Sequence, residues 1–123
     1  MQFASIRIIT DDLDAMVAFY EHLTGTTARR PAPVFAEIHT GPAVLAIATR
    51  ATVGMLGQDA PTPAANRSTL VEFEVDDVDA TVERLRAGLP DVVMPPTTMP
   101  WGNRSAVVRD PDGTLVNLFS RPA

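Results

Sequence analysis

The stretch Asp11-Asp12-Leu13-Asp14-Ala15 is matched, 65 residues later, by Asp76-Asp77-Val78-Asp79-Ala80. Each stretch follows a short apolar run and opens a segment whose apolar residues have helical spacing. An acid directly ahead of such a segment is a typical helix N-cap. A repeated strand-to-helix junction implies two copies of one structural unit, and copies this few and this long indicate a duplicated domain rather than a solenoid. A cavity between the copies is then the first place to expect a function.

Length and composition fit one domain made of two halves. The chain has 123 residues, of which 46% are hydrophobic and 20% are charged, and this length is sufficient for one core. The sequence contains neither an apolar run of about 18 residues nor the layout of a signal peptide. We therefore expect no membrane span and no export, and a cytoplasmic location by default.

The residue types that are missing exclude several kinds of chemistry. Cysteine is absent, which excludes disulfides, thiolate nucleophiles and cysteine-based metal sites. The only imidazoles are those of His22 and His39. The ten basic residues are all arginines and are scattered along the chain, so we expect no nucleic-acid partner. The net charge of −5 mildly favours a neutral or cationic ligand.

The first repeat reads as a β-α-β-β-β unit. Residues 3–10 alternate as a strand, and the helix after Asp11 or Asp12 ends at Gly25. His22 lies off the apolar stripe of this helix and receives no role. Strands are predicted near 27–30, at 34–39 and at 43–49. The predicted helix-facing set is Ile6, Ile8, Leu13, Met16, Val17, Tyr20, Leu23, Leu45 and Ile47.

The second repeat follows the same plan after a linker. Residues 51–68 are rich in Gly, Pro and Ala and form a linker, or a lid over a site. Strands are predicted at 70–75, 91–94, 103–109 and 114–120, and a helix at about 77–87 that buries Val78, Val82 and Leu85. Pro95-Pro96 is expected to interrupt any long strand, and Asp110-Pro111-Asp112-Gly113 to form the turn of a hairpin.

Alternation along the strands then predicts which side chains face away from the helices. These are Ser5, Arg7, Ile9, Val44, Ala46, Ala48, Leu70, Glu72, Glu74, Leu115, Asn117 and Phe119, and the small residues among them would leave open volume. If the turn at Gly41-Pro42 has two central residues, His39 pairs with Val44 and Glu37 with Ala46, on the same face.

Several of these residues have two interpretations. Arg7 and Glu72 occupy equivalent strands and either form a structural ion pair near a pseudo-twofold axis or contact a ligand. His39 is either a hydrogen-bonded strand residue or a general base. Trp101 is either an aromatic residue at the pocket rim or a packed cap on the sheet.

Three features together resemble the vicinal oxygen chelate superfamily of glyoxalase I, extradiol dioxygenases, fosfomycin-modifying enzymes and bleomycin-resistance proteins. They are the first junction with its helix end Phe19-Tyr20-Glu21-His22-Leu23-Thr24-Gly25, the second junction, and the segment from Trp101-Gly102-Asn103-Arg104 to Asp110-Pro111-Asp112-Gly113-Thr114-Leu115. The resemblance covers nearly the whole chain. It implies an α+β fold in which two βαβββ modules, about 1–50 and 69–123, form a single domain with a U-shaped mixed sheet and helices on its convex face. It also implies a homodimer.

The resemblance also implies where metal ligands would lie. In the metal enzymes of the family these positions correspond to Ser5, Ala46, Leu70 and Asn117, none of which carries an imidazole or carboxylate. We therefore expect a member that lacks the metal ligands and uses no cofactor. An alternative metal site would use Glu37, His39, Glu72 and Glu74. A Ser5–His39 nucleophile is disfavoured because no glycine elbow surrounds Ser5.

The sequence thus predicts a metal-independent protein that binds a small organic or antibiotic-like molecule in the concave sheet cavity. The alternative is a metal-free isomerase or lyase that uses Glu72 or His39 as general base and Arg7 to stabilise charge. A structural or regulatory module without a ligand is the third hypothesis. The predicted ligand-binding residues are Ser5, Arg7, Ile9, His39, Ala46, Leu70, Glu72, Trp101, Asn117 and Phe119.

Overall fold

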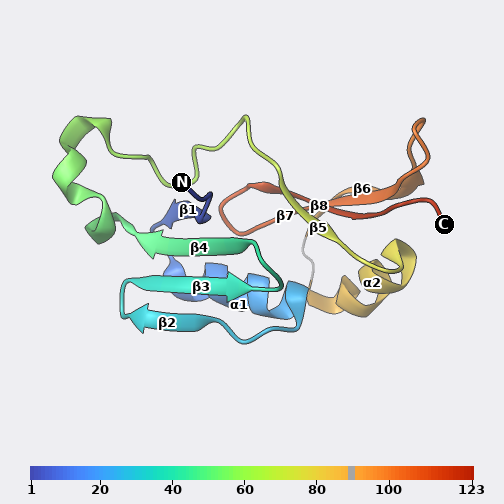
Figure 1. The fold of residues 1–123 in the computed structure, drawn as a ribbon, viewed down its shortest axis with the longest axis horizontal. Helices are drawn as coiled ribbons and strands as arrows, with labels where there is room; N and C mark the ends of the chain where they lie inside the picture. The colour runs from blue at the N-terminus through green and yellow to red at the C-terminus, as the bar shows by residue number, and fades with distance from the viewer. Residues whose placement is uncertain (89–90) are drawn as a thin grey trace. The chain divides into compact units, whose positions relative to one another are not determined.

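A computed structural model of the chain describes residues 1–88 and 91–123 (Figure 1). The chain divides into two units, Met1–Ala65 and Asn66–Ala123, and each is described by itself. In the described part of the chain, no helix is long and apolar enough to cross a membrane.

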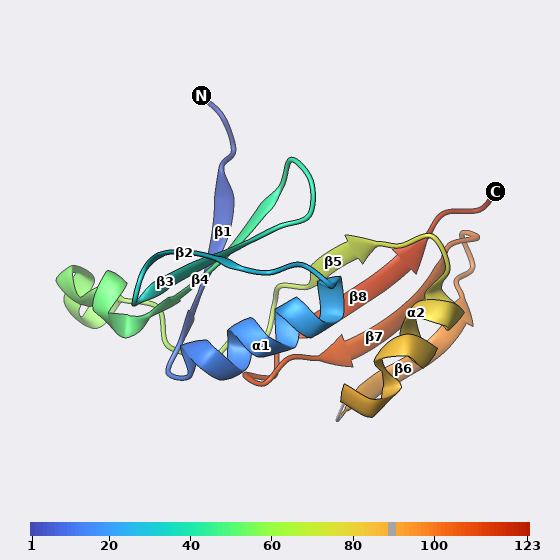
Figure 2. The same cartoon turned by 90° about the horizontal axis from the view of Figure 1, so that it is seen from below.

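Unit 1 contains a four-stranded mixed sheet with one α-helix. Its elements are β1 (Ser5–Thr10), α1 (Leu13–Thr24), β2 (Arg29–Ala32), β3 (Phe35–His39) and β4 (Val44–Thr49). The strand order is β1-β4-β3-β2, in which β1 and β4 are parallel and the other neighbours antiparallel. The helix lies on one face of this sheet, against β3 and β4 (Figure 2). The opposite face is called here the helix-free face of unit 1.

Unit 2 repeats this plan and confirms the predicted pair of βαβββ units. It consists of β5 (Val71–Glu74), α2 (Val78–Leu85), a 3-10 turn η3 (Arg86–Gly88), β6 (Val92–Thr98), β7 (Arg104–Arg109) and β8 (Leu115–Ser120). The strand order is β5-β8-β7-β6, which is that of unit 1 at equivalent positions. Its helix packs on β6, β7 and β8, so this sheet also has a helix-free face.

The acids of the repeated stretch cap and clamp the two helices. Asp12 accepts a hydrogen bond from the Ala15 amide at 3.1 Å, and Asp77 accepts one from the Ala80 amide at 3.0 Å, as predicted for N-caps. The fourth residue of each stretch instead binds an arginine. Asp14 lies 3.4 Å from Arg30, and Asp79 receives two hydrogen bonds from Arg104, at 2.8 and 2.9 Å. These hydrogen bonds are the main reason that the pKa of Asp79 lies below its ordinary value.

The predicted apolar faces of both helices are buried, with one addition and one correction. All five predicted positions of α1 are buried, and so is Phe19, whose ring meets Tyr20 edge-on with centroids 5.0 Å apart. The predicted positions of α2 are likewise buried. Ile6 was predicted to lie under the helix but is 47% exposed. It belongs to the edge strand β1, whereas α1 covers the central strands.

The predicted hairpin turns are confirmed, but the predicted strand break at Pro95-Pro96 is wrong. His39 pairs with Val44 and Glu37 with Ala46, as the two-residue turn predicted. The turn before β8 has Gly113 at φ +88°. Pro95-Pro96 does not end a strand, because β6 runs through both residues. A proline is tolerated there because β6 is an edge strand and its register with β7 shifts between Met94 and Thr97.

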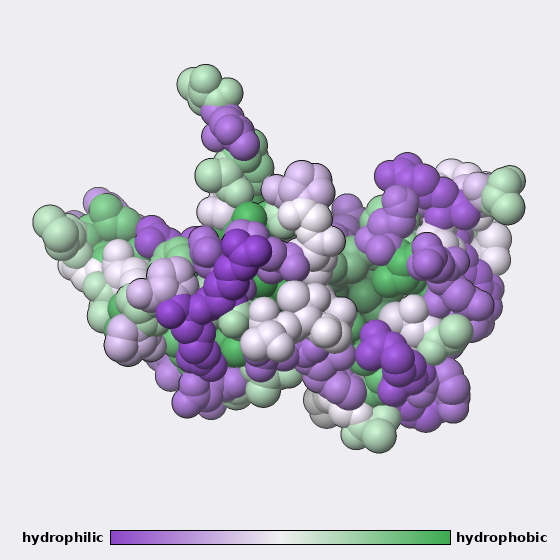
Figure 3. Space-filling view, turned by 60° about the horizontal axis from the view of Figure 1, so that its bottom comes forward, coloured by the Kyte–Doolittle hydropathy of each residue, from purple (hydrophilic) through white to green (hydrophobic). Residues whose placement is uncertain are grey.

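The segment after β4 folds back onto unit 1. It forms two 3-10 turns, η1 (Arg50–Thr52) and η2 (Gly54–Asp59). Met55 and Leu56 are exposed, and hydrophobic surface is visible over this segment at the left of the space-filling view (Figure 3). Val53, in contrast, is only 4% exposed and packs with Ile9 and Ala48, and Phe35 and Ala60 lie against this cluster.

Candidate functional site

Strand register arranges the helix-free face of unit 1 in three rows. Partner residues on neighbouring strands point to the same side of a sheet, so each row can be followed across the strands. The polar row is Ser5, Val44 and His39. The charged row is Arg7, Ala46, Glu37 and Arg29. The apolar row is Ile9, Ala48 and Phe35.

The apolar row is closed, although open volume was predicted above Ala48. Val53 and Ala60 pack against this row, and Ile9 and Ala48 are 6% and 0% exposed. Ile9 therefore belongs to a core cluster and is not an open pocket wall. The reason is that a side chain from the linker fills the space above the small residue. The other two rows retain exposed or half-buried polar side chains, among them Ser5, Arg7 and His39.

Glu37 and His39 form a carboxylate–imidazole pair on this face. The distance from Glu37 Oε1 to His39 Nε2 is 3.2 Å, and the two side chains are 29% and 24% exposed. An ionised carboxylate can only accept a hydrogen bond, so the contact requires a proton on Nε2. In the neutral ring, Nδ1 then carries the lone pair. Such a pair can take up a proton at a defined atom.

Two arginines in the charged row carry unbalanced charge. In residues 1–88 and 91–123, neither Arg7 nor Arg29 makes a hydrogen bond or ion pair, and both are exposed. Ala46 separates Arg7 from Glu37 along the row. Arg30, the neighbour of Arg29, points to the other face and reaches Asp14. The helix-free face of unit 1 therefore offers two free guanidinium groups beside one carboxylate.

On unit 2, two of the predicted site residues, Glu72 and Asn117, contact each other. Glu72 and Asn117 are register partners, and the Asn117 Nδ2 atom donates to Glu72 Oε2 at 2.9 Å. Within the described residues, the buried Oδ1 atom of Asn117 has no hydrogen-bond partner. A predicted contact between Arg7 and Glu72 would join the two units and stays a prediction.

A second cluster on unit 2 surrounds Phe119. Arg121 lies 3.0 Å from Glu74 Oε2, and its guanidinium carbon is 5.5 Å from the centroid of the Phe119 ring.

Leu70 precedes β5 and is 49% exposed. Trp101 lies in the turn before β7 and is 70% exposed, so the packed-cap interpretation was wrong. Arg121 was missed, although continuing the alternation beyond Phe119 would have placed it on this face.

A groove of about 380 Å³ lies apart from the predicted site residues. It is formed by α2 and β6 and is lined by Val82, Arg86, Val92, Pro95 and Pro96. Its charged lining residue, Arg86, is ion-paired with Glu83 at 3.1 Å. Among the described residues, the lining of the groove includes no general base and no side chain that commonly binds metal, so we place no chemistry there.

The four family metal positions do not fit a metal ion. Ala46 and Leu70 carry no donor atom, and Ser5 offers only a hydroxyl. Asn117 offers only its neutral Oδ1 atom, because its Nδ2 atom donates to Glu72. Transition metals require several nitrogen, sulfur or charged oxygen donors that converge on one point. Across the described residues, no three His, Asp or Glu side chains are grouped to hold a metal. Of the four residues of the alternative site, Glu37 pairs with His39 on unit 1.

The chain belongs to the Glyoxalase/Bleomycin resistance protein/Dioxygenase superfamily, whose family model matches residues 2–118. The "Putative glyoxylase CFP32" of Mycobacterium bovis is 32% identical over 118 residues, which are 95% of this chain and 42% of that protein. A protein of the same name from Mycobacterium tuberculosis gives the same values. The chain thus spans about two fifths of the length of these curated relatives.

Solved structures show the same fold. A glyoxalase/bleomycin resistance protein/dioxygenase from Nocardioides is 26% identical, with a TM-score of 0.76 over 99% of this chain and 84% of the other. A lactoylglutathione lyase from Agrobacterium tumefaciens is 25% identical, with a TM-score of 0.75 over 97% and 92%. A family enzyme from Burkholderia phytofirmans is 24% identical, with a TM-score of 0.82 over 95% and 96%, and shows similarity of fold.

Proposed function

We propose that this protein binds a small organic molecule without a metal ion, on the helix-free faces of its sheets. The observation that carries the proposal is the donor set at the family's metal positions, where Ala46 and Leu70 have no ligand atom. The faces themselves keep polar groups that can orient a ligand, such as Arg7 and Glu72. A face that lacks the metal ligands but has polar groups for recognition is better suited to binding a molecule than to metal-dependent catalysis.

The layout of unit 1 supports a ligand whose polar end contacts the charged and polar rows, because Val53 and Ala60 close the apolar row. The apolar row borders the charged row, which carries Arg7, and the polar row with His39 lies beyond it. In a small-molecule site, a few placed polar groups fix the orientation of the ligand. The side chains of Arg7 and His39 would orient the polar end of the molecule.

Thermal-shift measurements against a panel of small organic acids, amines and aromatic compounds test this proposal. A bound ligand raises Tm because it binds only the folded state. We expect at least one class to raise Tm equally in EDTA and in added Zn²⁺, Mn²⁺ or Fe²⁺. The proposal fails if no compound raises Tm, or if the shift disappears in EDTA and returns with metal.

A second candidate function is that of a metal-free isomerase or lyase. The Glu37–His39 contact favours it, because an imidazole held by a carboxylate is a common general base. The alternative base, Glu72, already accepts a hydrogen bond from Asn117, which disfavours it in this role. The similarity to a solved lactoylglutathione lyase supports this class of reaction.

We also propose that the protein is a homodimer, as the family resemblance implies. Light scattering coupled to size-exclusion chromatography tests this directly. A mass near 13.2 kDa, that of one chain, would contradict the proposal, and twice that mass would support it.

A further inference from the structure

We propose that the helix-free face of unit 1 is a proton-transfer site for small 2-oxo carboxylates. Arg7 binds the carboxylate, His39 removes a proton from the carbon next to the ketone, and Glu37 positions His39. The inference rests on the binding function proposed above, and adds a ligand class and a reaction. It uses residues of unit 1 only.

The first support is the orientation of the imidazole. The hydrogen bond to Glu37 Oε1, at 3.2 Å, places the proton on Nε2 and leaves Nδ1 as the basic atom. Within the described part of the chain, Nδ1 makes no hydrogen bond of its own. His39 is neither fully buried nor fully exposed, at 24%. A partly solvated imidazole can both reach a bound substrate and exchange its proton with water.

The second support is the free charge of Arg7. A guanidinium group binds a carboxylate through two parallel hydrogen bonds, and the Arg7 guanidinium is not engaged within the described residues. The net charge of −5 predicted a neutral or cationic ligand. The helix-free face of unit 1 differs locally, because Arg7 and Arg29 outnumber the single carboxylate of Glu37. An anionic ligand therefore suits this face.

The third support is the spacing between the anion-binding group and the base. Arg7 and Glu37 lie in one row, on β1 and β3, with Ala46 of β4 between them. Strands two places apart are separated by about 10 Å. Ala46 itself is only 1% exposed, so a ligand here would lie on the Arg7, Glu37 and His39 side chains and not on the sheet backbone. A short acid held by Arg7 would extend over these side chains towards His39.

The chemistry is balanced without an oxidant or reductant. The C–H bond next to the ketone breaks, its proton moves to His39 Nδ1, and the electron pair enters the carbonyl to form an enolate. Arg7 stabilises the added negative charge, and Glu37 stabilises the imidazolium. Return of a proton to the same carbon completes the cycle. An imidazole is strong enough only for carbon acidified by a neighbouring carbonyl, which favours oxo acids such as 2-oxo carboxylates over plain carboxylates.

Hydrogen–deuterium exchange of 2-oxobutyrate tests the reaction. In D₂O, we expect the wild-type protein to accelerate loss of the C3 proton signals in the NMR spectrum. His39→Gln should lower the protein-dependent rate by about 100-fold or more, and Arg7→Gln should weaken binding of the acid. The matched controls are His22→Gln and Arg30→Gln, which should retain the wild-type rate. Circular dichroism and Tm confirm that each variant is folded.

Glu37 needs a separate readout because it acts through His39. Nitrogen-15 NMR of the imidazole distinguishes the two neutral tautomers, and we expect the Nε2–H form in the wild-type protein. Glu37→Gln should mix the tautomers and slow the exchange reaction, and Glu37→Asp should restore part of both. A wild-type ring with its proton on Nδ1 would overturn the proposal.

The remaining outcomes separate this inference from the binding function. If 2-oxobutyrate shifts the amide signals of residues 5–9 and 37–46 but exchanges no faster than in buffer, binding stands and proton transfer is wrong. If other compounds raise Tm and 2-oxobutyrate does not bind, the ligand class is wrong. If His39→Gln exchanges as fast as the wild type, the base is wrong. If no compound binds, both proposals fail.

Discussion

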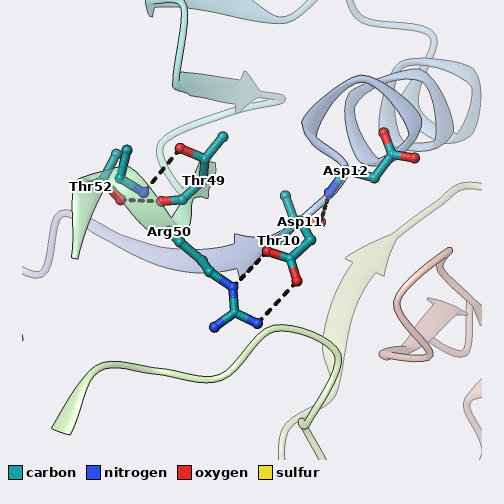
Figure 4. A network of polar contacts seen from close by, with 7 residues as sticks. Thr10, Asp11, Asp12, Thr49, Arg50 and Thr52 are labelled. Carbon is teal, nitrogen blue, oxygen red and sulfur yellow. Dashed lines mark hydrogen bonds and ion pairs between the residues drawn. The ribbon is translucent and has the colours of Figure 1, made fainter. Parts of the chain in front are cut away.

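Arg50 binds Asp11 through two hydrogen bonds, from Nε to Oδ1 at 2.7 Å and from Nη2 to Oδ2 at 3.1 Å (Figure 4). Arg50 is the first residue of η1, and Asp11 is the first residue of the repeated acidic stretch. The pair therefore ties the start of the linker to the junction between β1 and α1. The hydrogen bonds from Arg50, helped by its charge, lower the pKa of Asp11 below its ordinary value of 3.8, against a smaller opposing effect of desolvation.

Arg50→Gln should lower Tm slightly at neutral pH, because it removes this clamp. The pKa of Asp11 is lowered by folding, so its contribution is present above the pKa of the unfolded chain and is lost as pH falls through the folded value. The Tm difference between variant and wild type should therefore vanish in strong acid. Thermal denaturation across this pH range checks it. Arg67→Gln is the control, because in the described part of the chain Arg67 contacts just the neighbouring Asn66 carbonyl.

Val53→Ala should destabilise unit 1 by about 2 kcal/mol, because it removes two buried methyl groups and leaves a gap above Ala48. Chemical denaturation measures the change in the free energy of unfolding. Leu56→Ala, at a 55% exposed position of the same segment, should change it by less than about 0.5 kcal/mol. Equal effects of the two substitutions would show that Val53 does not anchor the linker.

Asp77→Ala should cost about 1 kcal/mol, because the first turn of α2 loses the acceptor for the Ala80 amide. Asp12→Ala should have a similar effect on α1. Asp77→Ser retains an acceptor and should recover most of the loss. Urea denaturation of the three variants provides the comparison, and an unchanged midpoint in Asp77→Ala would contradict the capping role.

Gly102→Ala should destabilise the β6–β7 hairpin for two reasons. The residue has φ +100°, and an added Cβ would lie 3.1 Å from the Pro122 side chain. Left-handed backbone at a non-glycine residue costs on the order of 1 kcal/mol or more. Gly41→Ala, which meets no atom within 4 Å and has no positive φ, should be nearly neutral. Tm measurements of both variants decide whether the position requires glycine.

Local patterns were enough to predict the caps, the helix faces and the register of β3 with β4. Each depends on residues close in sequence, such as Asp77 with Ala80 or His39 with Val44, so chain geometry limits the alternatives. The same register placed Glu37 and His39 on one face. Their direct contact depends on side-chain rotamers, which alternation along a strand does not specify.

The errors concern residues whose surroundings depend on distant segments. Ile6 was expected in the core because alternation along β1 places it on the helix-facing side of the sheet. It is exposed because β1 is an edge strand and extends beyond the helix, which covers the central strands. Ala48 was expected to border open volume, and Val53 fills the space instead. The buried Oδ1 atom of Asn117, which lacks a hydrogen-bond partner among the described residues, likewise depends on how several strands pack. None of these features leaves a periodic signal in the sequence.

The diproline in β6 has a consequence for how the protein avoids aggregation. A sheet can grow when another strand pairs with the free amide and carbonyl groups of its outermost strand. Pro95 and Pro96 occupy the middle of that strand in unit 2 and have no backbone N–H to donate. The residues that made this segment look unsuited to a strand therefore block the recruitment of further strands at this edge.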